Sequence, residues 1–136
     1  MTYVIREGDR TTTDGFVISA SGKVVVQSRK LARMGDLVWC PGCERVGFIA
    51  EGNPTCIDHY VAVATQGQAV QCGCPPGSHR LLASADSIAA DMDATISIPP
   101  DLAEVARMAA EQLLSAIQAG TLRAQLFSPL RPLVEP

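Results

Sequence analysis

The sequence repeats itself at an interval of 32 residues. Two cysteine doublets, Cys40-Pro41-Gly42-Cys43 and Cys72-Gly73-Cys74, begin 32 positions apart. The same interval relates apolar and glycine positions elsewhere: Val17-Ile18, Ile49-Ala50 and Leu81-Leu82; Ala32 and Ala64; Gly35 and Gly67; Val38 and Val70. Because units this short cannot each bury a hydrophobic face, we expect the copies to pack against one another.

Short β-branched segments separated by turn residues fill each copy. Residues 23–27 predict a strand, and residues 30–33 predict its hairpin partner across a Ser28-Arg29 turn. In the second copy the predicted strands are residues 48–50, 55–58 and 61–64. A truncated third copy survives as residues 80–84. Three copies arranged around one axis would give a compact, mostly β structure with trigonal symmetry.

The character of the sequence changes after Ser84. Residues 85–97 are small and polar and are expected to form a linker. Pro99-Pro100-Asp101 predicts the start of a helix, because prolines and an acid suit its first turn. Apolar residues then recur at helical spacing on one expected face: Leu102, Val105, Ala109, Leu113, Ala116 and Ile117.

The helix is expected to end at Gly120, because glycine suits the C-cap, and to be followed by a proline-rich tail over residues 122–136. This predicts two parts, a β-domain over residues 1–84 and an extension over residues 85–136 that contains linker, amphipathic helix and tail. The apolar stripe of the helix must either pack on the β-domain or dock to another protein, and we expect packing.

Composition and charge exclude several classes of protein. The chain has 136 residues and a formal net charge of −3, whereas nucleic-acid binding needs a clustered basic face. No apolar run reaches the roughly 18 residues of a membrane span, so no stable membrane insertion is expected. Residues 1–6 lack the apolar stretch of a signal peptide, and we therefore expect the chain to begin in the cytosol.

The cysteines are the residues that carry chemistry. Five cysteines in a reducing compartment are not expected to form disulfides, so metal binding or redox chemistry is the better reading of the doublets. Zinc takes four soft ligands in a tetrahedron, and the repeat should bring both doublets to one end of the molecule. We therefore expect one structural zinc bound by the following residues: Cys40, Cys43, Cys72 and Cys74. Cys56 is expected to be a small buried apolar residue.

Alternatives to this site stay open. A thioredoxin-type Cys-x-x-Cys opens a helix, but no helix signal follows Cys43, so disulfide exchange is disfavoured. His59, near a predicted turn, is the alternative zinc ligand if Cys43 or Cys74 points away. His79 looks like a surface loop residue. No nucleophile–base arrangement accompanies these two histidines, so we expect no enzyme activity.

Taken in order, these residues resemble the PAAR-repeat family, which forms the tip of the type VI secretion spike. The resemblance covers residues 3–84. It rests on these motifs: Gly8-Asp9-Arg10-Thr11-Thr12, Val17-Ile18-Ser19-Ala20-Ser21, Leu31-Ala32-Arg33-Met34-Gly35-Asp36, Cys40-Pro41, Ile49-Ala50-Glu51-Gly52-Asn53-Pro54-Thr55 and Gln71-Cys72-Gly73.

The resemblance implies a small pseudo-threefold β-cone, with 32-residue repeats and a C-terminal helical extension. Its broad base would sit on the blunt end of a VgrG trimer, and a zinc near the apex would be bound by histidine and cysteine. Relatives often have histidine where this chain has Thr13-Asp14, Cys43 and Gln68. Cys40, Cys43 and Cys72 match family ligand positions, whereas Cys74 is inferred from geometry alone.

Two functions are therefore expected from the sequence. The first is a non-enzymatic spike tip that caps VgrG and sharpens it for membrane puncture. The alternative is a PAAR carrier or adaptor, because many relatives carry extensions that are toxins or toxin adaptors; residues 85–136 would then load or lead into a secreted toxin effector, or bind a chaperone. In both cases the protein would stand in the bacterial cytoplasm before firing and be secreted into a target cell or the medium.

Overall fold

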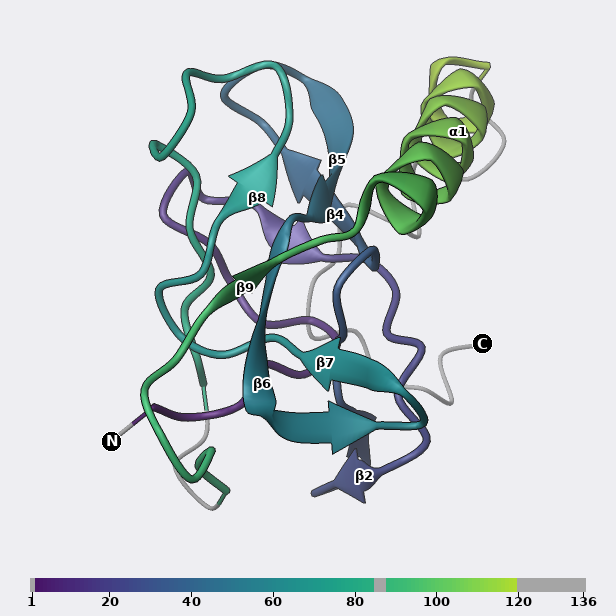
Figure 1. Cartoon of the computed structure of the whole chain (residues 1–136). Helices are drawn as coiled ribbons and strands as arrows, with labels where there is room; N and C mark the ends of the chain where they lie inside the picture. Colours follow the sequence, from purple (N-terminus) through teal and green to yellow (C-terminus); the bar gives the residue numbers. More distant parts are fainter. Residues whose placement is uncertain (1, 85–87, 120–136) are drawn as a thin grey trace.

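A computed structural model describes residues 2–84 and 88–119 (Figure 1). Over these residues the chain is mostly β with one helix near its end, as the sequence predicts. The elements follow in this order: β1 (Phe16–Val17), β2 (Val25–Val26), β3 (Arg29–Lys30), β4 (Leu37–Cys40), β5 (Arg45–Ile49), β6 (Glu51–Asp58), β7 (Val61–Val63), β8 (Val70–Gln71), β9 (Ile96–Ser97) and α1 (Pro100–Gln118).

The strands form three small antiparallel groups rather than one sheet. A four-stranded sheet has the order β1-β4-β5-β8, a three-stranded sheet has the order β7-β6-β9, and β2 and β3 form a hairpin. Most strands are only two to five residues long. Strands this short gain little stability on their own, so the packing between groups must hold the fold together.

A closed ring of backbone hydrogen bonds marks the pseudo-threefold axis. The N–H of Ile5 donates to the carbonyl of Ala64, that of Ala64 to Ala32, and that of Ala32 back to Ile5, each at 2.9 Å. Each residue of the ring is fully buried. Three chain segments therefore meet in the same way at one point, which is the trigonal arrangement expected from the repeat.

Each ring residue opens the same five-residue turn. The third residue after the ring is a glycine with positive φ, at +82° in Gly8, +93° in Gly35 and +86° in Gly67. The following side chain caps the turn by accepting a backbone N–H at 2.8 Å; the pairs are Arg6 to Asp9, Arg33 to Asp36 and Thr65 to Gln68. The first two turns are 27 residues apart and the last two 32. A search for residues repeated at 32 positions therefore relates the second and third turns but does not relate the first turn to them.

The hydrophobic core lies around this axis and is built from repeat-related residues. It consists of Ile5, Val17, Ala32, Val38, Ile49, Ala64, Val70 and Leu81. Val17, Ile49 and Leu81 accept equivalent hydrogen bonds from the three turn glycines. Apart from Ile5, these core residues are positions that recur at 32 residues, so the repeat in the sequence is the repeat of the core.

Three corners surround the core at the end that carries β2, β6 and β7 in Figure 1. Two are hairpins, β2–β3 and β6–β7, in which Val25 pairs with Lys30 and Ile57 with Ala62. Both are closed by two residues with positive φ, as a type I′ turn requires; they are Gln27-Ser28 and His59-Tyr60. The first turn thus lies one residue earlier than the Ser28-Arg29 turn expected from the sequence.

The third corner is formed by the pairing of the N-terminal segment with residues 88–90. Ala89 bridges Tyr3, and the N–H of Ala90 donates to the carbonyl of Thr2 at 2.9 Å. Farther on, β9 pairs with β6. Residues 88–90 and 96–97, expected as part of a linker, are therefore paired with the β-structure. This pairing could not be predicted from local sequence, because one strand of the corner comes from the N-terminal segment.

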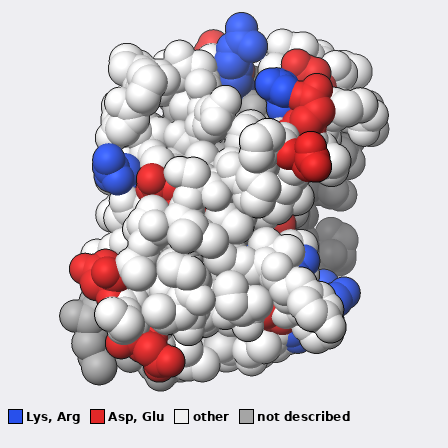
Figure 2. All heavy atoms as spheres, in the orientation of Figure 1, with Lys and Arg blue, Asp and Glu red and all other residues white. Residues whose placement is uncertain are grey.

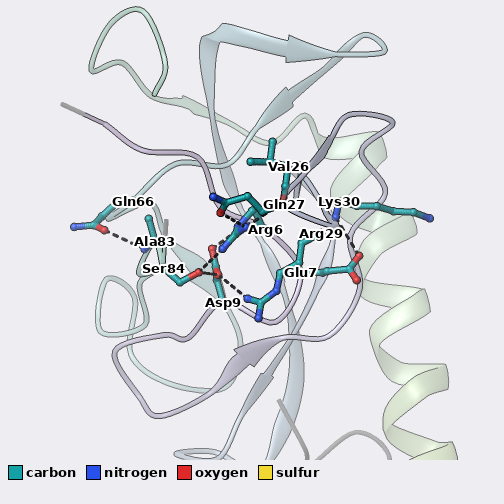
Figure 3. A network of polar contacts seen from close by, with 10 residues as sticks. All are labelled: Arg6, Glu7, Asp9, Val26, Gln27, Arg29, Lys30, Gln66, Ala83 and Ser84. Atoms are coloured by element: carbon teal, nitrogen blue, oxygen red, sulfur yellow. Dashed lines mark hydrogen bonds and ion pairs between the residues drawn. The ribbon is translucent and has the colours of Figure 1, made fainter. Parts of the chain in front are cut away.

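A polar network ties the first corner to the end of the third copy (Figure 3). The guanidinium of Arg6 donates to the Val26 carbonyl and the Gln27 side chain, both at 3.1 Å, and to Ser84 Oγ at 3.0 Å. Ser84 in turn donates to Asp9. Arg33, the counterpart of Arg6 in the second turn, donates to the Asp58 carbonyl at 2.7 Å. Both arginines thus hold a hairpin by its backbone.

Helix α1 packs on β4 and β5, which confirms packing on the β-domain. Its buried residues are Ala106, Ala110 and Ile117. Ala110 and Ile117 form a cluster with Val46, against which the half-buried residues Ile18, Leu37 and Trp39 pack. Of the residues expected on the apolar face, Ile117 is buried and Leu102, Ala109, Leu113 and Ala116 are half-buried. The expectation was wrong only for Val105, which is 63% exposed. The residues of α1 in this contact are Ala110 and Ile117 together with the half-buried Leu113 and Leu114.

Two further properties concern the apolar and the charged residues of the chain. Among residues 2–84 and 88–119, no helix is long and apolar enough to cross a membrane. In the view of Figure 2 most of the surface is uncharged, and the charged side chains occur in small separate groups. The expected C-cap at Gly120 and the tail over residues 122–136 lie outside the described residues.

Candidate metal centre

The pairing of β4, β5 and β8 brings the two cysteine doublets together. The first doublet occupies the tight turn after β4, where Cys40 pairs with Arg45 of β5. The second follows β8, which pairs with the far end of β5 through Ile49 and Val70. Gly47 permits this approach, since a Cβ there would lie 2.2 Å from the Gln71 carbonyl oxygen. Figure 1 shows both turns at the end of the molecule opposite β2 and β7.

The sulfur atoms of the two doublets form one compact group. The Sγ atoms of Cys40, Cys43, Cys72 and Cys74 all lie within 4.8 Å of one another, and Cys40 and Cys74 are 3.5 Å apart. Cys40 is buried, and the other three are partly exposed. The structure thus brings together the four cysteines selected from the sequence, in an arrangement that could hold a metal ion.

Backbone and hydroxyl groups around the sulfurs provide hydrogen bonds. The N–H of Gly73 donates to Cys43 Sγ at 3.3 Å, and the N–H of Cys74 donates to Cys72 Sγ at 3.4 Å. Thr13 Oγ1 lies 3.5 Å from Cys40 Sγ. N–H groups directed at sulfur favour the thiolate, which is the form that binds metal.

The thiol pKa values differ widely across the group. Burial acts to raise the pKa of Cys40, but hydrogen bonds from Thr13, Cys43 and Cys74 outweigh it and lower that pKa to about 7. The hydrogen bond with Cys40 raises the pKa of Cys74 to about 11, and burial raises the pKa of Cys72. Four thiols this close cannot all ionise unless a cation compensates their charge. The arrangement therefore suits a metal ion better than it suits four free thiols.

His79 is a residue that sequence reasoning misjudged. The expectation of a surface position was wrong, because His79 is only 1% exposed. Its Nδ1 lies 3.3 Å from Cys72 Sγ and its Nε2 2.8 Å from Thr11 Oγ1. Burial lowers its pKa to about 4, so the imidazole is neutral near pH 7. A signal was present: His79 stands two residues before Leu81, as Gly47 does before Ile49, which is an inward position of the repeat.

Thr13 is the first-copy counterpart of the leading cysteines. It stands four residues after Asp9, as Cys40 does after Asp36 and Cys72 after Gln68. The threefold arrangement therefore directs three equivalent turns at one place. Two of them contribute sulfur and the third contributes a hydroxyl next to Cys40.

The other two candidate residues lie apart from the four-sulfur group. His59 occupies the β6–β7 turn, where its side chain is 64% exposed and its Nδ1 lies 3.1 Å from Asp58 Oδ1. Cys56 lies in β6 and packs, half-buried, against a second apolar cluster: Val4, Val26, Leu31 and Val63. Burial raises its pKa. The structure thus does not bring His59 to the sulfurs, and Cys56 has apolar surroundings as expected.

A family model described as the PAAR motif matches residues 7–76. The chain belongs to the PAAR-motif family. The match runs from the first turn glycine through the second cysteine doublet, so it includes all four clustered cysteines and ends before His79 and α1. No curated protein and no solved structure matches this PAAR chain significantly.

Proposed function

We propose that this PAAR chain is the non-enzymatic tip of a type VI secretion spike, with an apex held by one structural zinc ion. The observation that carries the proposal is the group of four sulfurs at one end of a pseudo-threefold β-domain that matches the PAAR motif. The ligands proposed are Cys40, Cys43, Cys72 and Cys74. Membership of the family supports the role in the spike, and the donor set supports zinc.

The geometry of the sulfur group fits zinc. Zn–S bonds of about 2.3 Å in a tetrahedron place sulfurs about 3.8 Å apart. The 3.5 Å separation of Cys40 and Cys74 and the 4.8 Å limit for the whole group lie around that value. Thiolates select soft metals, and four of them leave no open position for a substrate, which makes the site structural.

A metal crosslink answers a physical need at the apex. The hydrophobic clusters lie around the ring, in the hairpin corners and under α1, whereas the turns that carry the cysteines are largely exposed. Turns that converge on a point cannot bury enough apolar surface to hold themselves. A structural zinc supplies on the order of 10 kcal/mol in small sites. An apex fixed in this way would resist fraying when driven through a membrane.

The opposite end offers a base for a threefold partner. Val25 and Ile57 occupy equivalent places in two corners and are 56% and 54% exposed, although both are apolar. Tyr60, at the tip of the second hairpin, is almost fully exposed. Exposed apolar side chains repeated about an axis suit a symmetric protein surface. We assign this base to the blunt end of a VgrG trimer.

The C-terminal region supports a second candidate, a carrier or adaptor for an effector. The proposed division keeps residues 1–84 as the zinc-binding β-cone and residues 85–136 as its extension. Val105 and Met108 remain exposed on α1 after the helix has packed on the sheet. That face would bind a secreted effector or its chaperone. In both proposals the chain resides in the bacterial cytoplasm before firing and leaves with the spike.

Two substitutions test the base and the helix separately in pull-down assays with the cognate VgrG. Ile57→Asp should abolish capture by VgrG, because it places a charge in the proposed apolar contact. Val105→Asp, a matched change on the outer face of α1, should leave capture unchanged. If VgrG still captures both the Ile57→Asp variant and a Val25→Asp variant, the assigned base is refuted. Loss of an effector only in the Val105 variant would support the adaptor role.

A further inference from the structure

His79 is the only member of its repeat position that carries a side chain. Its counterparts are glycines in tight surroundings: a Cβ at Gly15 would lie 1.9 Å from the Trp39 carbonyl oxygen, and one at Gly47 would lie 2.2 Å from that of Gln71. In the third copy the same position carries a buried imidazole between Cys72 and Thr11. The symmetry of the fold therefore directs an imidazole at the sulfur site, in addition to the thiols and the Thr13 hydroxyl.

The hydrogen on this imidazole can be placed from the chemistry of Cys72. A metal-bound cysteine is a thiolate, which accepts hydrogen bonds and donates none. At 3.3 Å from Cys72 Sγ, an Nδ1 without hydrogen would turn its lone pair toward the charged sulfur. An Nδ1 that carries the hydrogen instead donates to it. The thiolate state of Cys72 thus selects the Nδ1–H tautomer.

Thr11 completes the arrangement on the other side of the ring. Its Oγ1 accepts the backbone N–H of Gly15 at 3.1 Å and keeps its own hydrogen to donate. His79 Nε2 lies 2.8 Å from this oxygen, whereas Thr13 Oγ1 lies 3.4 Å away. Because it is nearer, His79 Nε2 is the better acceptor for the Thr11 hydroxyl hydrogen. Thr11 therefore holds the tautomer in which Nε2 accepts and Nδ1 donates.

We propose that His79 is a positioning residue of the metal centre, which donates its Nδ1–H to the Cys72 thiolate while Thr11 fixes the tautomer. The inference rests on the metal site proposed above and adds a residue outside the four sulfurs. The hydrogen bond orients Cys72 and stabilises its negative charge beside the Cys74 N–H that also points at it. Partners of this kind typically account for about 10- to 100-fold in metal affinity.

Two amide substitutions separate donation to Cys72 from simple filling of the site. In His79→Asn the amide nitrogen can take the place of Nδ1 and donate to Cys72. In His79→Gln it takes the place of Nε2 and reaches only Thr11. The full chain is titrated with Co²⁺ and with Zn²⁺ in competition with a coloured chelator, and circular dichroism at saturating metal checks the fold. His59→Asn is the control, because His59 is exposed and lies in the β6–β7 turn.

We expect His79→Asn and the control to bind within about threefold of the wild type, and His79→Gln to bind about 10- to 100-fold more weakly. Thr11→Val should also weaken binding, by less. The sulfur-to-Co²⁺ absorption band should keep its intensity in every variant, since all four thiolates remain. Equal affinity of the Asn and Gln variants would overturn the role of His79 and leave the zinc site standing. A changed absorption band in both the His79→Asn and the His79→Gln variants would mean that His79 is itself a metal ligand, which would also overturn its positioning role. A wild type that binds neither metal would refute the proposed site itself.

Discussion

Arg6 and Ser84 lie 78 positions apart in the sequence, yet the guanidinium of Arg6 donates to Ser84 Oγ at 3.0 Å. This contact joins the first turn of the domain to the end of its third copy. The same arginine holds the backbone of the β2–β3 hairpin through the Val26 carbonyl. A cone made of repeated units has to close on itself, and Arg6 is one of the groups that close it.

Arg6→Met should therefore destabilise the fold, although it keeps most of the apolar stem. The Val26 carbonyl and the Ser84 hydroxyl would lose a charged donor in a buried setting, which costs about 2–4 kcal/mol. Urea unfolding measures the loss. Arg107→Met is the matched control, since Arg107 is an exposed residue of α1 that forms a surface ion pair with Glu104 and should change stability by about 0.5 kcal/mol or less. Equal effects of the two substitutions would contradict the closing role of Arg6.

Removal of the metal should lower thermal stability sharply if the four sulfurs hold zinc. A loss of several kcal/mol corresponds to a fall of roughly 20 °C in the unfolding midpoint of a domain of this size. A chelator series with elemental analysis measures the effect and should find one zinc per chain. Cys40→Ser should reproduce the fall, whereas Cys56→Ser should not, because Cys56 lies outside the group. A metal-free protein of unchanged stability would exclude the site.

Asp58 should make the fold sensitive to acid. Burial acts to raise its pKa, but backbone hydrogen bonds from Val24 and Lys23, the His59 hydrogen bond and the Arg33 charge together lower it. A lowered folded pKa means that the carboxylate stabilises the fold above its unfolded pKa of about 3.9. That contribution is lost as the pH falls through the lower folded value.

Comparison of Asp58→Asn with the wild type isolates this contribution, because release of metal in acid affects both proteins. The stability difference should be largest near neutral pH and shrink below about pH 4. Asp36 is the contrasting control, because burial raises its pKa in the folded state. Its ionisation therefore lowers the stability of the fold as the pH rises from the unfolded pKa to the higher folded pKa. Chemical unfolding at a series of pH values gives both curves. A difference for Asp58 that stays constant with pH would show that its charge does not contribute.

The third corner should depend on residue 90. Ala90→Pro removes the N–H that donates to the Thr2 carbonyl, and we expect a cost of about 1–3 kcal/mol and faster amide exchange in residues 2–5. Hydrogen exchange followed by mass spectrometry localises the change. Met92→Ala, at an exposed side chain nearby, should leave exchange in residues 2–5 as it is. Unaltered protection there in the proline variant would mean that the N-terminal segment holds its place without this pair.

The contact face of α1 can be tested by enlarging its alanines. Ala110→Leu should cost about 1–3 kcal/mol, because the side chain would be forced against Val46 and Trp39. Val105→Leu should be nearly neutral, since Val105 faces outward. Thermal unfolding of the two variants distinguishes the faces. The reverse order would mean that Val105 and not Ala110 faces the sheet.

Several features of the fold were readable in the sequence because they arise from local pattern. The recurrence of Val17, Ile49 and Leu81 reports a position that is buried in every copy, and such positions tolerate few residue types. The start of α1 was readable because prolines and an acid at residues 99–101 satisfy the first turn without other partners. The four cysteines could be chosen together because a repeat places equivalent turns at equivalent points.

Other features depend on segments that are distant in the sequence. His79 was taken for a surface residue because its neighbours are polar and small, and only the approach of Thr11 and Cys72 buries it. The third corner was missed because residues 88–90 pair with residues 2–4 rather than with a following strand. Val105 was wrongly placed on the buried face of α1 because hydrophobicity alone favours it, whereas the residues buried there include the smaller Ala106 and Ala110.

By itself, then, the sequence determined the period of the core, the mostly β character with a C-terminal helix, and the membership of the two doublets in one symmetric set. Only the tertiary structure decided how the ring of Ile5, Ala32 and Ala64 closes, which hairpin is completed by the N-terminus and which side chains surround the sulfurs. The physical reason is the range of the interactions. Periodicity and turn chemistry act over a few residues, whereas ring closure and burial depend on groups brought together from the whole chain.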